Sequence, residues 1–500
     1  MLRVAGNQKR TCAGSSRREM LVAGGLQGLA AGMAGLTGQW AGSSPVFAAP
    51  AALQSESLSQ RGPGKAKSVI CLFLFGGWSQ LETFDMKPGA PSEIRGPYRS
   101  INSTVPGLQV CEHLPLLSQR MHQLALIRSV NSPDANHNTC MILTGHDGTV
   151  SGTATKAFNP GIPRDRPYFM SALQYLRDRE GITRDNSQLP QQMCVPNRLG
   201  LLEGYYRTGP YGGLLGSRYD PICTQFGRNG EKLFQPGGVA AETLSLLPDG
   251  AALGPEMTLN RLDRRKDLLE QLEAERRRLM TAPAIGRYSY REQQVLQMLT
   301  SDAVKTALDL QQESMELRNS YGWNLFGQSV LLSRRLVEHG VPLVTAIWDC
   351  TKEGPDIAGL GWDTHWDHFK ACDGWLLPGV DRAISALLDD MSARGMLDET
   401  LVVVLSEMGR TPQINSRAGR DHWVGTYCAL MAGAGIQPGA VYGASDSTAS
   451  YVADSPVSPQ DLLATIYHLT GFGPETLVYD NQNRPSSLYG EGQAIRGILL

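Results

Sequence analysis

Five continuous apolar runs constrain the fold of this chain more than any other feature of its sequence. The runs cover residues 68–75, 124–130, 341–348, 400–406 and 426–433. Because polar residues hardly alternate within them, these runs are typical of strands that are covered on both faces of a sheet. Helical patterns lie between them, such as the recurrence of Val380, Ile384, Leu387 and Met391. This alternation predicts a three-layer α/β/α fold with a largely parallel sheet.

Local signals predict further helices. Ser458, Pro459 and Asp461 supply an N-cap, a first-turn proline and an acidic N3 residue for a helix that ends before Gly471. The segment 256–339 is long and charged and has a helical pattern. We interpret this segment as a helical insertion on the surface of the domain.

The first fifty residues have the features of a targeting segment. Arg17 and Arg18 precede a weakly apolar run that is rich in glycine and alanine, and small residues follow it. This pattern predicts a twin-arginine export signal over 1–50, and the many glycines make a transmembrane anchor the weaker alternative. We expect a linker at 51–67 and one domain over 68–500. The protein should then be periplasmic or extracellular, with no membrane span after the signal is removed.

Charge and cysteine usage argue against two classes of function. The formal net charge is -2, which gives no electrostatic reason to expect nucleic acid as a partner. Eight of the nine cysteines lie outside the predicted signal, and none of them forms a CxxC pair, which argues against a cysteine-based zinc site. An exported chain can nevertheless carry one or two disulfides.

Acidic, imidazole and guanidinium groups follow the predicted strands. Ligands meet a parallel α/β sheet at the carboxyl ends of its strands, so residues in these positions are the candidates for a site. The candidates are Asp363, His365, Asp367, His368, Glu407, Arg410, Asp421 and His422. Carboxylates and imidazoles that converge from separate loops are what a divalent metal ion requires. The sequence therefore predicts a metal site.

Several ordered motifs carry a family resemblance. They are "CLFLFGGWSQLETFDMKP", "ALIRSVNSPDANHNT", "GSRYDP", "GWDTHWDHF", "DETLVVVLSEMGRTPQIN", "GRDHW" and "VYGASD". From about residue 65 onward the chain resembles the exported bacterial family known as domain of unknown function 1501. That family is similar to the alkaline phosphatase superfamily, which includes sulfatases and phosphodiesterases. The resemblance implies an alkaline-phosphatase-like fold, whereas an activity does not follow from a fold.

The resemblance implies a metal site formed by Asp363, His368 and His422. Glu407 takes the place of an acidic ligand in the superfamily's second metal site, and Asp421 is a further candidate ligand. Met408, however, stands where that second site has a histidine, and Gly76 follows the first strand where an aspartate is expected.

Two neighbours of these ligands stay open as alternatives. His365 and Asp367 are adjacent to the predicted ligands, and either one could fix the orientation of a ligand side chain by a hydrogen bond. The spacing alone does not decide whether His365 or His368 binds the metal.

The catalytic groups are less determined than the ligands. Thr139 and Ser132 are the hydroxyl candidates for a nucleophile, and His137 could act as a ligand or as a base. Arg410 could offer a planar fork of donors to a tetrahedral oxyanion, or it could form an ion pair with Glu407 or Asp421. The nearby residues Trp362, Trp366 and Trp423 could wall the site, although packing is their more common role.

Two functions of different classes are consistent with these residues. The first is an exported hydrolase of sulfate or phosphate esters, with zinc, manganese or calcium as the metal. Its substrate would be a small molecule or a polysaccharide ester. The second is a non-catalytic binding or assembly protein that retains a degenerate form of the fold. The sequence does not specify a protein partner.

Overall fold

The computed structural model describes residues 64–134, 137–146, 165–182, 189–200, 207, 209–224, 301–349 and 361–500. The chain divides into Met1–Ser57 and Leu58–Leu500, and every described residue lies in the second unit. The predicted export signal, the linker up to residue 63, residues 256–300 of the predicted insertion and Cys350 lie outside the described residues. Within the described ranges, none of the helices combines the length and apolar character that a membrane crossing needs.

An eight-stranded sheet forms the centre of this unit. Its strands, in spatial order, are β12 (Val441–Tyr442), β4 (Leu124–Val130), β11 (Tyr427–Ala432), β8 (Thr400–Leu405), β1 (Ser68–Leu74), β7 (Leu343–Trp348), β5 (Gln192–Val195) and β6 (Ile222–Cys223). β11 runs antiparallel to β4 and β8, and the other pairings in the sheet are parallel. The predicted α/β fold with a largely parallel sheet is therefore confirmed. The five apolar runs correspond to β1, β4, β7, β8 and β11.

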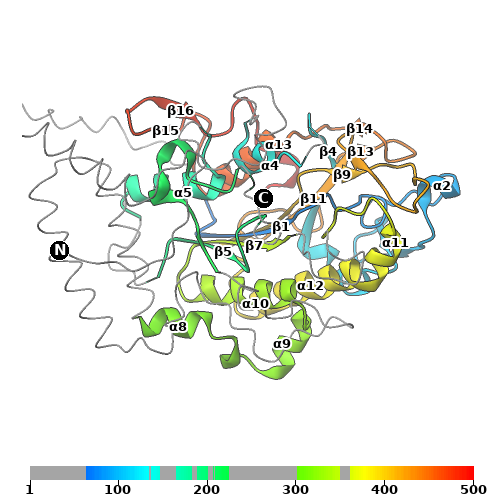
Figure 1. The fold of residues 1–500 in the computed structure, drawn as a ribbon, viewed down its shortest axis with the longest axis horizontal. Coiled ribbons are helices and arrows are strands. Elements are labelled where there is room, and N and C mark those ends of the chain that lie inside the picture. Colours follow the sequence, from blue (N-terminus) through cyan, green and yellow to red (C-terminus); the bar gives the residue numbers. More distant parts are fainter. Residues whose placement is uncertain are drawn as a thin grey trace, which may run out of the picture. The chain divides into compact units, whose positions relative to one another are not determined.

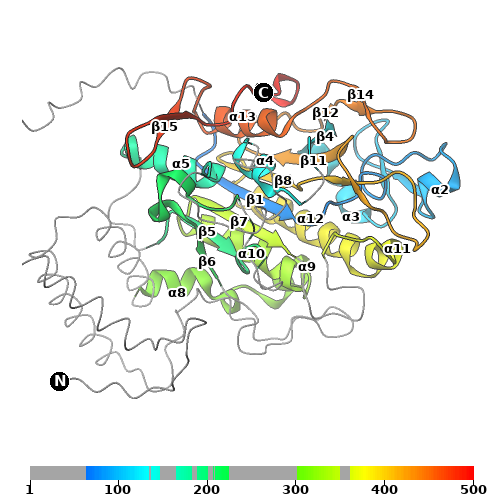
Figure 2. The same ribbon diagram turned by 45° about the horizontal axis from the view of Figure 1, so that its top comes forward.

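Helices cover both faces of the sheet, because each central strand is apolar on both sides. Ile70, Leu72 and Leu74 of β1 point into one buried cluster, and Val69 and Phe73 point into the other. One face is covered by α8 (Asp302–Leu308), α9 (Met315–Tyr321), α10 (Leu325–Glu338) and α12 (Leu377–Ala393), and the other by α4 (Thr139–Thr144), α5 (Phe169–Arg179) and α13 (Pro459–Leu469). Figures 1 and 2 show these two sets of helices on opposite sides of the strands.

The second half of the predicted insertion is part of the helix layer. Asn324 accepts a hydrogen bond from the backbone N–H of Gly327 and so caps the start of α10. α10 is buried along most of its length and packs against the sheet and α12. The segment from 301 to 339 therefore contributes to the core, although its charged pattern suggested a surface position. At α13, Ser458 and Asp461 form the predicted capping box.

Short elements complete the domain. Four two-stranded ribbons pair β2 (Ser100–Asn102) with β3 (Gln109–Cys111), β9 (Gly409–Arg410) with β10 (His422–Trp423), β13 (Ala444–Ser445) with β14 (Val452–Asp454) and β15 (Leu477–Tyr479) with β16 (Pro485–Ser487). The short α-helices are α2 (Ser92–Arg95), α3 (Pro115–Ser118) and α11 (His368–Ala371), and a π-helical turn at Cys372–Leu376 joins α11 to α12. Short 3₁₀ turns lie at Met121–Gln123, Gly213–Leu215, Ser217–Tyr219, Leu310–Gln312 and Arg496–Ile498.

The direction of β11 brings distant segments to the edge of the sheet that is formed by the C-terminal ends of the parallel strands. β1, β4, β7 and β8 run in the same direction, so the segments that follow them leave at the same edge. Because β11 is antiparallel to β8, it begins where they end, and β10 lies just before it in the chain. The segments after four strands and the segment before a fifth therefore meet at this edge.

Candidate metal centre

Three segments at this edge of the sheet bring imidazole groups to one carboxylate. His137 lies beyond β4, Asp363 and His365 lie beyond β7, and His422 is in β10. β10 pairs with β9, and His422 is opposite Arg410 in that ribbon. The backbone of His137 is left-handed, with φ of 52°, a conformation that a non-glycine residue adopts at a cost of roughly 1–3 kcal/mol. Such conformations are concentrated at functional sites.

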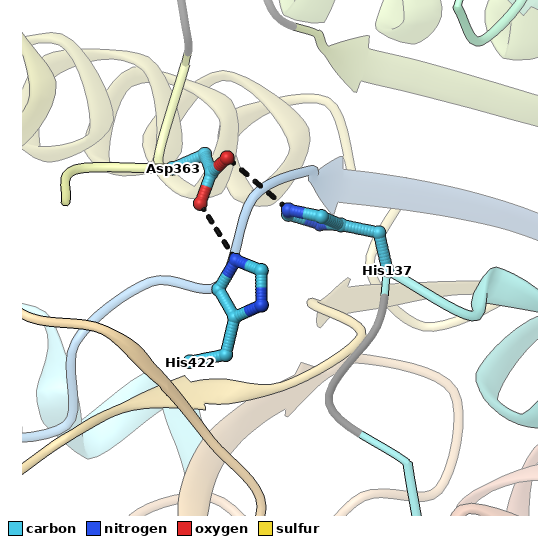
Figure 3. Close-up of side chains that lie close together, drawn as sticks. All are labelled: His137, Asp363 and His422. Carbon is cyan, nitrogen blue, oxygen red and sulfur yellow. Dashed lines mark hydrogen bonds and ion pairs between the residues drawn. The ribbon is translucent and has the colours of Figure 1, made fainter. Parts of the chain in front are cut away.

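The carboxylate of Asp363 is the centre of the group (Figure 3). Its Oδ1 atom is 2.9 Å from Nε2 of His422 and 3.1 Å from Nε2 of His365, and its Oδ2 atom is 3.2 Å from Nε2 of His137. The Nε2 atoms of His365 and His422 are 2.9 Å apart. Within the described ranges, His137, Asp363 and His422 form the one group whose ligand atoms lie close enough together to share a metal ion. Nε2 of His365 also contacts Oδ1 of Asp363, but His365 is not a member of that group.

Two further carboxylates bond to the Nδ1 atoms of two of these imidazoles. Glu407 accepts a hydrogen bond from Nδ1 of His137 at 2.8 Å, and Asp421 accepts one from Nδ1 of His365 at 2.6 Å. With a proton on Nδ1, the Nε2 atom of each ring is the one that donates to Asp363 or, once it loses its proton, binds a metal ion. Glu407 and Asp421 were predicted as ligands, whereas the structure places them as partners of the ligand imidazoles. This arrangement of carboxylate, histidine and ligand point is common around protein-bound metals.

Charges in the group are strongly coupled. Burial by itself raises the pKa of the Asp363 carboxyl, but hydrogen bonds from the three imidazoles outweigh it and hold this pKa far below its usual range. Burial disfavours a charge on His137, yet its bonds to Asp363 and Glu407 raise its pKa to about 9. The bond to Asp363 raises the pKa of His365, whereas burial lowers the pKa of His422. Asp363 is therefore ionised, and a metal ion that binds here displaces protons.

Arg410 positions Asp363 and does not face a substrate. Its Nε donates to the carbonyl oxygen of Gly77 at 3.0 Å, and Nη1 donates to that of Arg420 at 3.0 Å. Its Nη2 donates to the carbonyl oxygen of Gly76 and to Oδ1 of Asp363, the latter at 2.5 Å. The guanidinium is fully buried. The predicted fork for an oxyanion is thus taken up by the protein, and the ion pair that forms is with Asp363 instead of Glu407 or Asp421.

The glycine at the end of β1 is explained by the close approach of the Asp363 segment. Gly76 has φ of 114°, and a Cβ atom added to it would lie 2.4 Å from the backbone nitrogen of Asp363. The N–H of Gly76 donates to Glu407 at 2.9 Å. Backbone therefore occupies the place where the superfamily resemblance implies an aspartate, and a side chain there would push Asp363 away.

His368 is not brought to Asp363, although it was predicted as a ligand with Asp363 and His422. It is buried in the first turn of α11, where Nδ1 is 2.5 Å from Thr364 Oγ1 and Nε2 is 3.0 Å from Glu82 Oε2. Both of its ring nitrogens are engaged there, and His137 is the imidazole that joins Asp363 and His422 instead. Of the two histidines left as alternatives, His365 is the one that contacts Asp363, with Nε2 3.1 Å from Oδ1.

Glu82 is a structural residue that sequence reasoning missed. It also accepts two hydrogen bonds from Arg420, at 3.1 and 2.6 Å, and both side chains are buried. Arg420 is two residues from His422, and His368 lies beyond Asp363, so this cluster braces the two loops that carry the ligands. The available signal was a single acidic residue in the segment after β1, at "WSQLETF".

The remaining predicted residues surround the group. Thr139 is the buried first residue of α4, two positions after His137, and Ser132 is half-buried after β4. Asp367 is exposed before α11. Trp362 is buried between other tryptophans, which confirms packing as its role. Trp366 stacks on the ring of His365, with 6.5 Å between the centroids, and Trp423 follows His422.

Comparisons with known proteins give one family and several distant structures. The family model described as "Protein of unknown function (DUF1501)" matches residues 66–499. No curated protein matches the sequence.

The structures include the phosphonate monoester hydrolase SpPMH from Silicibacter pomeroyi, with 12% identity, a TM-score of 0.37 and coverage of 86% of this chain and 76% of that chain. The PsFucS1 sulfatase from Pseudoalteromonas sp. has 11% identity, a TM-score of 0.37 and coverage of 87% and 72%. An alkaline phosphatase superfamily protein from Vibrio parahaemolyticus has 12% identity, a TM-score of 0.35 and coverage of 82% and 67%.

Proposed function

This chain belongs to the DUF1501 family, and we propose that it is an exported metal-dependent hydrolase of phosphate or sulfate esters. The observation that carries the proposal is the convergence of three Nε2 atoms on the Asp363 carboxylate. Two of the three imidazoles are held by a second carboxylate on Nδ1, as ligands of a metal ion usually are. The resemblance of the sequence motifs to the alkaline phosphatase superfamily supports the choice of ester hydrolysis.

The donor set fits a borderline divalent ion. His137, His422 and Asp363 would hold it, and His365, whose Nε2 is 3.1 Å from Oδ1 of Asp363, would supply a fourth donor. Such a set suits zinc and also accepts manganese, whereas calcium prefers six to eight oxygen ligands and is disfavoured by the imidazole donors. A bound ion of this kind acts as a Lewis acid on an ester oxygen and lowers the pKa of a bound water.

The surrounding residues keep the donors in place. Glu407 and Asp421 fix the orientation of the His137 and His365 rings, and Arg410 fixes the Asp363 carboxylate through the bonds described above. These contacts preorganise the donors, so that little rearrangement is needed when an ion or a substrate binds. The identity of the nucleophile stays open between a bound water and the hydroxyl of Thr139 or Ser132.

A non-catalytic binding or assembly protein is the second candidate. It is favoured by the buried Arg410, because four of its five N–H groups donate to carbonyl oxygens and to Asp363 instead of facing a tetrahedral anion. The replacement of a first-strand acid by Gly76 points the same way. Such a protein would keep the metal without turning over an ester.

The proposal is tested by metal analysis followed by an ester panel. The full chain, purified without chelator, should contain about one equivalent of zinc or manganese. His422→Ala should lose this metal, whereas His468→Ala, which removes an exposed imidazole on α13, should keep it. The metal-loaded protein should hydrolyse a chromogenic phosphate or sulfate ester, and a chelator should stop it. If the protein binds metal but hydrolyses none of the esters, the hydrolase proposal is wrong and the non-catalytic binding or assembly protein is favoured.

Removing the carboxylate behind His365 should weaken metal binding without unfolding the protein. Asp421→Ala deletes a side chain that is 51% exposed, and the loss of its bond to Nδ1 frees the His365 ring to turn. We expect the dissociation constant for zinc to rise about 10- to 100-fold, as measured by competition with a chromophoric chelator. Asp454→Ala, at an exposed position of β14, is the matched control and should bind as the unchanged protein does. Equal affinities in the two variants would contradict an orienting role.

A further inference from the structure

Two cysteines face each other across neighbouring strands at the edge of the sheet. Cys194 of β5 and Cys223 of β6 are direct partners in the parallel register. Neighbouring strands lie about 4.8 Å apart, which is within the Cα separations of roughly 4.4–6.8 Å that a disulfide spans. Residues in register point to the same face, and both side chains belong to the same apolar cluster. The Cys194 thiol donates to the carbonyl oxygen of Asn197 and the Cys223 thiol to that of Pro221, so neither is held by a strong partner.

No disulfide joins the seven cysteines that the structure describes. We propose that Cys194 and Cys223 form a disulfide bond with each other when the protein meets an oxidising thiol–disulfide couple. This inference does not depend on the proposed function, because both residues lie outside the metal centre.

The exposure of the two thiols sets the order of the reaction. Cys223 is half-buried, whereas Cys194 is 3% exposed. The neighbouring Cys223, together with burial, raises the pKa of the Cys194 thiol well above its ordinary value. Cys223 is therefore the thiol that attacks first, since attack requires an accessible thiolate.

The chemistry balances with a small disulfide such as oxidised glutathione. The Cys223 thiolate attacks one glutathione sulfur, which forms a mixed disulfide and releases one glutathione thiol. Cys194 then attacks Sγ of Cys223 and releases the second glutathione thiol. Two protein thiols lose two electrons and two protons, and one glutathione disulfide gains them.

The cross-link would anchor a segment that touches the metal-centre loop. β6 has only two residues and lies at the edge of the sheet, so it is held by few backbone bonds. The chain between the two cysteines includes Gly209, where an added Cβ atom would lie 3.3 Å from the carbonyl oxygen of Thr139. Thr139 is two residues from His137. The disulfide would thus fix the segment that packs against the start of α4.

The test is a direct search for the cross-linked peptide. The full chain is equilibrated with oxidised or reduced glutathione, quenched with acid, alkylated and digested with trypsin without reduction. Trypsin releases each cysteine in its own peptide, residues 185–198 and 219–228. We expect these peptides to be joined in the oxidised sample and separately alkylated in the reduced one. Recovery of both peptides unlinked, or of glutathione on Cys223 without a cross-link, would overturn the proposal.

Thermal unfolding provides a second readout. Oxidation should raise the unfolding midpoint of the unchanged protein by roughly 2–5 °C, since the bond closes a long loop in the unfolded chain. Cys194→Ala should remove this difference. Cys428→Ala, which removes a buried thiol of β11, should keep it. A shift that persists in Cys194→Ala would mean that another pair is responsible.

Discussion

Replacing Asp363 with asparagine is expected to abolish metal binding and also to destabilise the metal-free protein by about 3 kcal/mol. The carboxylate is the one negative group between the buried Arg410 guanidinium and three imidazoles. Asparagine has nearly the same shape but no charge, so Arg410 is left without an acidic partner and a protonated His137 keeps only Glu407. Removing one partner of a buried pair typically costs about 3–5 kcal/mol. The measurement is urea unfolding in the presence of chelator, with metal content determined in parallel.

The control for this variant is His422→Ala in the same buffer. It should lose the metal as well, but it keeps the pair of Asp363 and Arg410, so its metal-free stability should fall by only about 1 kcal/mol. A larger loss of metal-free stability in Asp363→Asn than in His422→Ala would show that Asp363 holds the group together, whereas His422 acts as a ligand. If the two variants were equally stable without metal, Asp363 would not be the electrostatic centre of the group.

Replacing Glu82 with glutamine should have the largest effect on stability outside the metal centre. Glu82 is buried between Arg420 and His368, and its loss leaves the Arg420 charge buried without an acidic partner. We expect the free energy of unfolding at pH 7 to fall by about 3–5 kcal/mol. Glu399→Gln is the matched control, because Glu399 pairs with Lys67 at the surface and its side chain is 57% exposed. That change should cost less than about 1 kcal/mol.

The loss of stability caused by Glu82→Gln should depend on pH. Burial alone raises the pKa of Glu82, but Arg420 and His368 outweigh burial and lower it from 4.5 to about 2. Since the folded-state pKa is below the unfolded value, the stabilisation is fully present above pH 4.5 and is lost as the pH falls toward 2. The difference in unfolding free energy between the unchanged protein and Glu82→Gln should therefore shrink between pH 5 and pH 3. A difference that stays constant over this range would exclude the charge of Glu82 as its cause.

Much of the fold and part of the site could be predicted from local patterns. The apolar runs predicted β1, β4, β7, β8 and β11, because a strand buried on both faces needs apolar residues in every position. Asp363, His365 and His422 were among the predicted ligands because the segments that carry them follow predicted strands in the chain. The capping box at Ser458 could also be predicted from the sequence, because all of its contacts are within one helical turn.

The roles of other residues could not be predicted from local sequence patterns. His368 and His137 both follow strands, and spacing along the chain does not say which face of a loop a side chain occupies. His368 starts α11 and points into the core toward Glu82, whereas the left-handed backbone of His137 presents its ring to Asp363. Arg410 has donors that suit an anion, and only the positions of three carbonyl oxygens show that the donors are taken.

The sequence by itself thus determined the layered α/β architecture, the edge of the sheet where chemistry is concentrated, and the kind of atoms gathered there. These follow from periodicity and from residue types, which are local properties of the chain. Only the tertiary structure decided which imidazoles meet Asp363, which carboxylates stand behind them, and that Arg410 supports the site from within. Those assignments depend on how segments 60 to 330 residues apart approach one another, because hydrogen bonds and metal bonds are decided over a few ångströms in space.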